Sequence, residues 1–251
     1  MAPALSAAVA LAAYRRGALS PSGSAGAVLV GAAVFGAGGR RGSALLLLFF
    51  GSSSALSRLS GADKKPRRSL VQVLANGGVP AALALLQHVW PSRHAASAYA
   101  GALAAANSDT WATEIGALSG TPARLITTRR PVERGTSGAI TPLGTLASVA
   151  GALAIGAASA AIERRPDAIW RAAVGGIAGS LADSLLGATL QATYTCTVCG
   201  ERTEDRRHAH SDAPPALILT GGLPWMTNDT VNLCASLVGA AGGALLAGSR
   251  R

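Results

Sequence analysis

Four acidic residues stand within or at the ends of long apolar stretches of this sequence: Asp109, Glu114, Asp183 and Asp229. A charged side chain costs about 3 kcal/mol or more in the hydrocarbon core of a bilayer, so carboxylates in such stretches are rare and usually functional. Carboxylate oxygens are the ligands that Mg²⁺ prefers, and Mg²⁺ often shares them with substrate phosphates. The four residues therefore predict a magnesium-binding catalytic site. The alternative is that each is a structural carboxylate satisfied by a neighbour.

Side-chain amides accompany these acids. Asn107 lies two residues before the first of them, and the last apolar stretch contains Asn228 and, one helical turn later, Asn232. Gln72 and Asn76 are also one turn apart and share a helix face. We expect these amides to line the same site and contact substrate. Asn228 could instead be a helix N-cap.

Basic residues in the segments between the apolar stretches could hold phosphate oxygens. The candidates are Lys65, Arg68, Arg129 and Arg134. The segment 135–138 (Gly135, Thr136, Ser137, Gly138) could add backbone N–H groups at a helix N-terminus, where anions bind well. Each arginine taken singly also fits the ordinary role of a positive anchor in a cytoplasmic loop. The sequence has no GxxxxGK[ST] motif, which excludes a standard P-loop nucleotide site.

Metal ligands of another kind occur in the polar stretch 194–227. A CxxC pair, Cys196 and Cys199, is followed by His208 and His210. Two thiolates and two imidazoles would complete a tetrahedral structural Zn²⁺ site, although their spacing is irregular. The alternative is a pair of reduced thiols that bind no metal. Cys234 lies in an apolar stretch and is expected to pack there, and an odd cysteine count gives no disulfide framework.

The composition shows what must position these residues. Only 14% of the residues are charged and the mean hydropathy is +0.36, whereas soluble domains are about 25% charged. Lipid is therefore expected to cover much of the surface. The net charge of +10 comes from short basic clusters between apolar runs, not from one basic stripe. This pattern is typical of loops in membrane proteins and argues against a nucleic-acid partner.

The apolar runs predict an all-α, polytopic transmembrane helical bundle, with seven or eight membrane segments in a single domain over 1–251 and a cytoplasmic loop insert at 194–227. The first run is short and could only dip into the membrane. It has no basic region before it, so we interpret it as a helix and not as a signal peptide. The predicted segments are 2–13, 23–39, 43–57, 69–90, 94–118, 136–162, 168–192 and 229–248.

Lys and Arg are more numerous on one side of this alternating topology, which is predicted to be cytoplasmic, with both termini outside. Each polar cluster then falls at the cytoplasmic ends of the helices, which suggests one site there. In the seventh segment, glycines spaced four apart form a packing face that also carries Asp183.

The fifth segment poses a geometric problem. On a straight helix Asn107, Trp111 and Glu114 share one face, whereas Asp109 and Thr113 point elsewhere. One regular helix cannot direct Asp109 and Glu114 at the same point. The helix is therefore expected either to break in this region or to pack on both sides and serve two subsites.

These motifs resemble one family of integral membrane proteins, which includes transmembrane protein 19 and plant phytyl-phosphate kinase. The resemblance covers nearly the whole chain. It implies a multi-pass fold and, from the plant member, phosphoryl transfer to an isoprenoid monophosphate from a nucleoside triphosphate such as CTP. The segments that carry it are RRGALSPSG (15–23), Arg68 with QVLANG (72–77), NSDTWATEIG (107–116), LITT (125–128), GTSG (135–138), GSLADSLLGATLQ (179–191) and NDTVN (228–232).

The sequence thus favours a membrane-embedded kinase with Mg²⁺ as cofactor and, in the loop insert, a structural Zn²⁺. Its expected partners are membrane lipid, a nucleoside triphosphate and an isoprenoid phosphate, and its expected location is a prokaryotic plasma membrane with the site at the cytoplasmic face. Intramembrane acids and glycine-broken helices also mark ion-coupled transporters and lipid flippases, which are the main alternative. A non-catalytic membrane scaffold is the third.

Overall fold

The computed structural model describes residues 2–61, 67–204 and 217–248, and within them it is an all-α membrane-protein fold with two small sheets. The prediction of a polytopic helical bundle is confirmed. The helices are α1 (Ala2–Arg15), α2 (Pro21–Ala37), α3 (Gly39–Leu59), α4 (Leu70–Val89), α5 (Arg93–Gly116), α6 (Pro142–Glu163), α7 (Ala168–Thr189) and α8 (Asn228–Ala247). The strands are β1 (Arg124–Leu125), β2 (Ala139–Ile140), β3 (Thr193–Cys196), β4 (Arg202–Thr203) and β5 (Leu217–Gly221).

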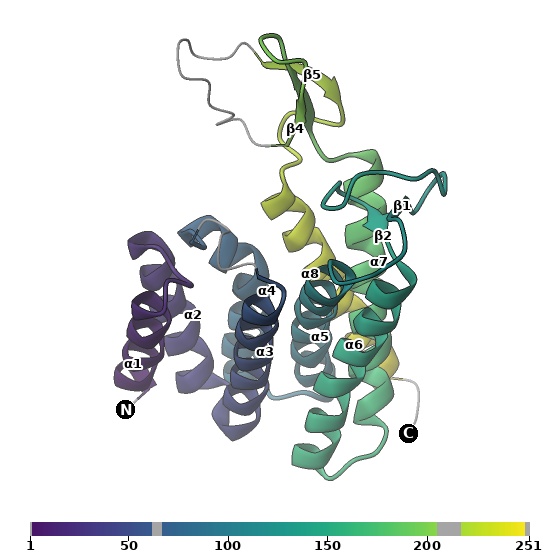
Figure 1. The fold of residues 1–251 in the computed structure, drawn as a ribbon. Helices are drawn as coiled ribbons and strands as arrows, with labels where there is room; N and C mark the ends of the chain where they lie inside the picture. The colour runs from purple at the N-terminus through teal and green to yellow at the C-terminus, as the bar shows by residue number, and fades with distance from the viewer. Residues whose placement is uncertain (1, 62–66, 205–216, 249–251) are drawn as a thin grey trace.

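The helices run alternately up and down, so that both termini lie at one end of the bundle and all five strands at the other (Figure 1). We call the strand-bearing end, where α1, α3, α5 and α7 finish, the loop end. Five helices are long and apolar enough to cross a membrane, namely α3, α4, α6, α7 and α8, and α2 is a shorter apolar helix. The alternation agrees with the topology that the sequence predicted.

Helix α5 occupies the centre of the bundle and contacts α3, α4, α6, α7 and α8. Most of its residues from 97 to 108 are small, and all of them are buried, so protein surrounds this helix on all sides. A helix shielded in this way does not need the hydrophobicity of a lipid-facing span. This explains how it can carry the polar run that begins at Asn107 and still lie at the core of a membrane protein.

Small residues allow α5, α7 and α8 to approach backbone to backbone. A Cβ added to Gly101 would lie 2.2 Å from the carbonyl oxygen of Gly239, and one added to Gly243 would lie 2.3 Å from that of Ser97. A Cβ on Gly179 would lie 2.4 Å from the Cβ of Ala105. In lipid, where apolar burial between helices gains little, such close packing is a main source of association. The predicted glycine face of the seventh segment is this seam.

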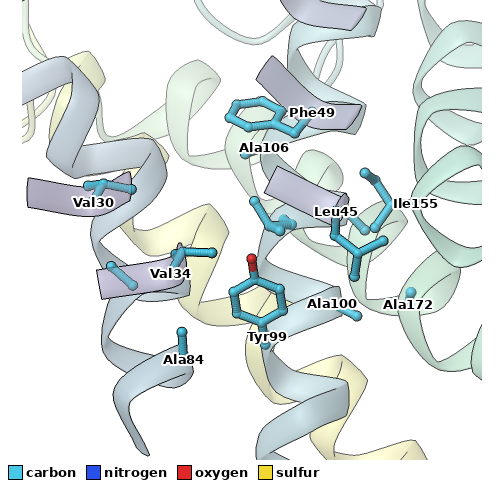
Figure 2. Close-up of a cluster of buried hydrophobic side chains, with 13 residues drawn as sticks. Val30, Val34, Leu45, Phe49, Ala84, Tyr99, Ala100, Ala106, Ile155 and Ala172 are labelled. Atoms are coloured by element: carbon cyan, nitrogen blue, oxygen red, sulfur yellow. The ribbon is translucent and has the colours of Figure 1, made fainter. Parts of the chain in front are cut away.

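A second packing region joins the amino-terminal helices to α5 and α6 (Figure 2). Val34 of α2, Leu45 of α3, Leu103 of α5 and Ile155 of α6 are fully buried in it. The hydroxyl of Tyr99 also lies in this region and donates a 2.7 Å hydrogen bond to the carbonyl oxygen of Gly42 on α3. This bond satisfies the phenol where water is absent.

The helix starts follow ordinary capping chemistry, and two differ from the sequence prediction. Helix α8 is capped by Thr227, whose side chain accepts from the N–H of Thr230, so the N-cap role considered for Asn228 is wrong. Helix α6 begins at Pro142 with Thr141 as its N-cap, not at 136. The reason is strand β2, which pairs with β1 and keeps the chain extended up to the cap.

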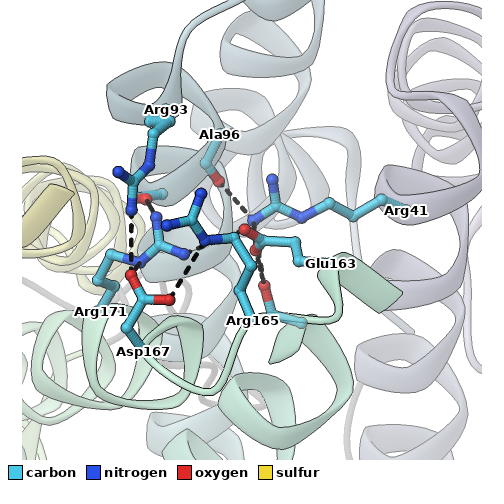
Figure 3. A network of polar contacts seen from close by, with 9 residues as sticks. Arg41, Arg93, Ala96, Glu163, Arg165, Asp167 and Arg171 are labelled. Carbon is cyan, nitrogen blue, oxygen red and sulfur yellow. Dashed lines mark hydrogen bonds and ion pairs between the residues drawn. The ribbon is translucent and has the colours of Figure 1, made fainter. Parts of the chain in front are cut away.

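An ionic network ties the helices together at the end opposite the strands (Figure 3). Glu163 accepts from Arg41 at 2.7 Å and from Arg171 at 3.0 Å. Arg41 also donates to the carbonyl oxygen of Ala96, and Arg171 to the hydroxyl of Ser97. The sequence motifs did not single out any of these three charged residues. The network joins α3, α5, α6 and α7, which explains how their termini are held in register.

Candidate functional site

The helix seam brings two of the predicted acids into contact. On α5, Ala105 and Asp109 are one turn apart on one face, and on α7 Gly179 and Asp183 have the same spacing. Gly179 packs directly on Ala105. One turn nearer the loop end, the carboxyl groups of Asp109 and Asp183 lie within hydrogen-bonding reach of each other. The small residues therefore set the distance between the two acids.

Two carboxyl groups in contact form an unusual arrangement. Atom Oδ2 of Asp183 is buried and has no hydrogen-bond partner within the described part of the chain. Adjacent carboxylates repel one another unless a proton or a cation neutralises one of the charges, and the repulsion is stronger where water is excluded. The donor set consists of oxygen atoms only, as Mg²⁺ prefers, and Mg²⁺ commonly binds through one or two carboxylates together with substrate phosphates. The pair therefore fits a Mg²⁺ ion.

The other two predicted acids are not part of this pair. No group of three His, Cys, Asp or Glu side chains in the described ranges could hold a single metal ion. The expectation that four acids surround one ion is therefore corrected. Glu114 points to a different side of α5, towards α3, and Asp229 is half-buried in the first turn of α8.

Helix α5 is continuous from Arg93 to Gly116, so it packs on both sides and does not break. The face opposite Asp109 is bound to its neighbours. Asn107 donates to the carbonyl oxygen of Gly151 at 2.8 Å and accepts from Ser52 at 3.0 Å, and Trp111 donates to the same serine hydroxyl. Asn107 therefore joins α3, α5 and α6, and its amide is directed away from the acid pair.

Glu114 forms the second polar cluster of the loop end. It is only 5% exposed and accepts a 3.0 Å hydrogen bond from the hydroxyl of Ser57, and another from Ser60. Arg68 is close enough to interact electrostatically with it. Burial lowers the pKa of the Arg68 guanidinium from its ordinary value, and the charge of Glu114 opposes that effect. The serines were not predicted, because hydroxyls are common in small-residue helices and their spacing carries no distinct signal.

The backbone of Arg68 is fixed by the α1–α2 connection. Its N–H donates to the carbonyl oxygen of Ala18, and its carbonyl oxygen accepts from the N–H of Ser20. A Cβ on Gly23 would lie 1.9 Å from that carbonyl oxygen, so only glycine permits the approach. The segment 15–23 and Arg68, which are far apart in the sequence, thus form one unit.

The turn at 135–138 lies against the end of α7. Its glycines have positive φ, and a Cβ on Gly138 would lie 2.4 Å from the Cβ of Ala188. The turn does bind an anion. The carboxylate of Glu204 accepts from the Ser137 N–H at 3.1 Å, from the Ser137 hydroxyl at 2.7 Å and from the Gln191 amide at 2.6 Å. The prediction that this turn forms a helix N-terminus is wrong, because β2 separates it from α6.

The remaining candidates for phosphate contact differ in what surrounds them. Arg134 donates to the carbonyl oxygens of Ala117, Ser119 and Thr121 just beyond α5, so its guanidinium caps that helix end. Arg129 is exposed and has a positive φ of 57°. Lys65 lies outside the described residues. Thr136 belongs to the exposed part of the 135–138 turn, and Asn232 is half-buried on α8.

Gln72 and Asn76 continue a face of α4 that packs on the bundle centre. Further along that face, Val79 and Leu83 pack against the cluster formed by Ala98 and Ala102 of α5 with Ala240 of α8. Helices α4 and α5 are antiparallel (Figure 1). Seven residues are about 10 Å along either helix. Gln72 lies seven residues before Val79 on α4, and Asp109 lies seven residues after Ala102 on α5. Because the two helices are antiparallel, both steps run towards the loop end. The amides are therefore at the height of the acid pair.

The loop insert contains half of the predicted zinc site. Cys196 ends β3 and is fully buried, and its sulfur accepts from the N–H of Val198. Burial raises the pKa of its thiol, but the N–H groups of Cys199 and Val198 bring the pKa below its ordinary value. His208 and His210 lie outside the described residues, so the Cys₂His₂ site stays a prediction.

Comparison with known proteins places this arrangement in a family. The family described as Integral membrane protein DUF92 matches residues 4–240. Protein PGR of Arabidopsis thaliana is 33% identical over 270 residues, which cover 93% of this chain and 91% of that protein. An uncharacterized membrane protein of Methanocaldococcus jannaschii is 46% identical over 124 residues, 49% of this chain and 52% of the archaeal one. No solved structure matches.

Proposed function

This chain belongs to the DUF92 family of integral membrane proteins, and we propose that it is a membrane-embedded kinase that transfers a phosphoryl group from a nucleoside triphosphate to an isoprenoid monophosphate. The observation that carries the proposal is the contact between Asp109 and Asp183. CTP is the first donor to test and phytyl monophosphate the first acceptor, because the sequence resembles plant phytyl-phosphate kinase.

The chemistry requires positioning and charge neutralisation more than covalent help from the protein. An anionic oxygen of the acceptor phosphate attacks the γ-phosphorus of the donor. The bond from that phosphorus to the bridging oxygen breaks, and the electron pair leaves with the nucleoside diphosphate. The products are a lipid diphosphate and the nucleoside diphosphate. The attacking oxygen is already ionised, so no residue is assigned as a general base.

Asp109 and Asp183 would hold the Mg²⁺, which when bound neutralises charge on the transferring phosphates. The amides of Gln72 and Asn76, at the same height, would orient phosphate oxygens. Asp229 and Asn232 at the start of α8 would border the nucleotide. The donors of Ser137 in the turn at 135–138 are taken by the Glu204 carboxylate, so a phosphate would bind there only by displacing it.

The depth of the acids favours an enzyme over a transporter. Asp109 is seven residues before the end of α5 at Gly116, and Asp183 is six before the end of α7 at Thr189. At 1.5 Å per residue both lie about 10 Å from the loop end of helices that are about 33–36 Å long. Transport sites lie near the bilayer midplane, whereas a kinase must reach soluble nucleotide. We place the loop end at the cytoplasmic face, because the Lys/Arg excess lies there.

The test is phosphoryl transfer by purified protein in detergent, with labelled nucleoside triphosphates, Mg²⁺ and phytyl or geranylgeranyl monophosphate. We expect a lipid diphosphate whose formation falls at least about a hundredfold in Asp109→Asn and Asp183→Asn, since each removes a charge that holds the ion. Asp167→Asn, at the opposite end of the bundle, is the matched control and should keep full activity. Equal activity in all three variants, or no product from folded protein with any nucleotide, would rule the mechanism out.

A further inference from the structure

An apolar groove lies between the amino-terminal helices, and its polar end is formed by the amides that the proposed function uses. It runs between α1, α2, α3 and α4, is open to the surroundings along part of its length, and has a cavity volume of about 100 Å³. Enclosed pockets for small ligands are typically about 300–1,000 Å³, so a long chain would lie along this open groove and not inside a closed cavity. Its walls include Val9, Ala27, Phe35, Leu47 and Phe50. Leu47 is also 42% exposed, so the groove opens on the lipid-facing surface of the protein.

One wall of the groove is lightly held. Helix α1 packs chiefly on α2 and lies at the outer edge of the molecule (Figure 1). The hydroxyl of Ser6 donates to the carbonyl oxygen of Val28 at 2.7 Å and lies 3.3 Å from the carbonyl oxygen of Ala27. A long apolar chain could therefore enter from the bilayer sideways without disturbing the tightly packed α5–α7–α8 seam.

The loop end of the groove is polar and positively charged. Arg68, Gln72 and Asn76 line it there. Within the described residues the Arg68 guanidinium has no hydrogen bond or ion pair, and its interaction with Glu114 is electrostatic only. The side-chain oxygen of Gln72 accepts from the Ser69 N–H, and the side-chain N–H₂ of Asn76 donates to the backbone carbonyl oxygen of Gln72. Arginine commonly binds phosphate through charge-assisted hydrogen bonds, and here the half-buried Arg68 lies beside two amides that could add further donors.

The selectivity of this groove for a ligand is expected to come from the charge of the ligand's head group. Moving an apolar tail from bilayer to protein exchanges one apolar environment for another, so the tail alone adds little affinity. A phosphate at the rim would meet Arg68, and only a lipid with a terminal phosphate offers both parts at once. Gln72 and Asn76 also lie at the height of Asp109, as the register of α4 on α5 indicates. A phosphate bound at the rim would thus face the acid pair.

We infer that the α1–α4 groove binds the tail of a single-chain lipid monophosphate and that Arg68, with Gln72 and Asn76, binds its phosphate. This inference rests on the proposed function for the role of that lipid as phosphoryl acceptor, but the binding itself does not require transfer. The acceptor therefore enters from the side of the amino-terminal helices.

The experiment is photo-crosslinking without nucleotide. A prenyl monophosphate with a diazirine in its tail is irradiated with the purified protein in nanodiscs, and the modified residues are mapped by mass spectrometry. We expect adducts on α2 and α3 within the groove. Unlabelled phytyl and hexadecyl monophosphate should compete, whereas phytol, inorganic phosphate and phosphatidic acid should compete at least about tenfold less well, because each lacks the phosphate, the tail or the single-chain form.

Matched variants distinguish binding in the groove from binding on the outer surface of the protein. Ala27→Phe fills the groove, and Leu29→Phe adds a ring on the same helix at a residue that is 62% exposed and outside the groove. Arg68→Gln removes the rim charge, and Arg67→Gln removes a charge that lies 5.8 Å from the Tyr14 ring. Ala27→Phe and Arg68→Gln should each weaken competition by about tenfold, whereas both controls should stay within about twofold. Arg68→Lys should restore part of the loss.

Other results would overturn the inference. Adducts spread over lipid-facing surfaces outside the groove, or equal competition by phytol, would mean nonspecific partitioning. Equal competition by phosphatidic acid would mean a general site for anionic lipids. Thermal unfolding of each variant shows whether a loss reflects misfolding, and the charge-restoring Arg68→Lys decides the point if Arg68→Gln is unstable. If adducts form in the groove but no phosphoryl transfer is found, this inference holds and the proposed kinase function is wrong. If transfer is found but the adducts lie elsewhere, the proposed function holds and this inference is wrong.

Discussion

The carboxyl groups of Asp109 and Asp183 meet across the interface of α5 and α7, one turn beyond the contact of Ala105 with Gly179. This relationship gives a stability test that does not depend on finding a substrate. Two like charges in contact destabilise the bundle, and a divalent cation bound between them would remove that repulsion.

We therefore expect Mg²⁺ to raise the unfolding temperature of the wild-type protein in detergent, and EDTA to reverse the effect. A ligand at a hundred times its dissociation constant stabilises by about 2.7 kcal/mol. Asp183→Asn should remove the response to Mg²⁺ without lowering the stability measured in EDTA. Thermal scans with Mg²⁺, with Ca²⁺ and without divalent ions give the comparison. An equal Mg²⁺ response in the variant would locate the ion elsewhere.

The small-residue seam gives a second prediction. Gly179→Ala would put a Cβ at 2.4 Å from the Cβ of Ala105 and 2.7 Å from the carbonyl oxygen of Ala235, and neither can move without shifting a helix. We expect it to destabilise the bundle by about 1–3 kcal/mol, the usual cost of overpacking. Gly78→Ala on α4 meets nothing within 4 Å and should be neutral or stabilising by up to about 1 kcal/mol. Unfolding temperatures of both variants in one detergent test this, and equal effects would contradict it.

The sequence predicted the helices well, because a membrane span leaves a long apolar run that few other structures produce. It also predicted that successive helices alternate in direction and that Gln72 and Asn76 lie near the start of α4. It could not tell that Glu114 would join Ser57 and Ser60 while Asp109 joined Asp183. Both pairings depend on which helix lies against which side of α5, and helix neighbours are set by three-dimensional packing of small residues that look alike in sequence.

The same limit applies to Glu204 and Glu163. Glu204 lies in the loop insert and was not considered, yet its carboxylate is bound by Ser137 and Gln191. Glu163 follows a run of apolar residues at the end of α6 and reads as an ordinary helix end. Only the approach of α3 and α7 makes it the centre of an ionic network. Long-range pairings of single charged residues leave no periodic signal in a sequence.

The Glu163 network gives a third prediction. Arg171 has a side chain that is 5% exposed, and Arg41 one that is 20% exposed. Glu163→Gln would leave both guanidiniums without this counter-charge, and removing one partner of a buried ion pair costs about 3–5 kcal/mol. We expect a large fall in unfolding temperature that affects α3, α6 and α7 together. The control is Asp167→Asn, whose carboxylate is 42% exposed and should contribute about 1 kcal/mol or less. Similar losses in the two variants would show that burial does not determine the cost.

Asp167 itself supplies a prediction about pH. Partial burial raises the pKa of this carboxyl, but the guanidiniums of Arg171, Arg165 and Arg93 outweigh it and hold the pKa below its ordinary value of about 3.9. A carboxyl group whose pKa is lowered on folding stabilises the folded state above its unfolded pKa, and that contribution disappears as the pH falls through the folded pKa. The small stability difference between wild type and Asp167→Asn should therefore be constant from about pH 5 to pH 7, decline as the pH falls below the ordinary pKa of about 3.9, and vanish once the pH has passed the lowered pKa of the folded protein. Denaturant midpoints across this range would measure it. If the stability difference instead grew towards acid pH, folding would raise the pKa of Asp167, which would contradict this prediction.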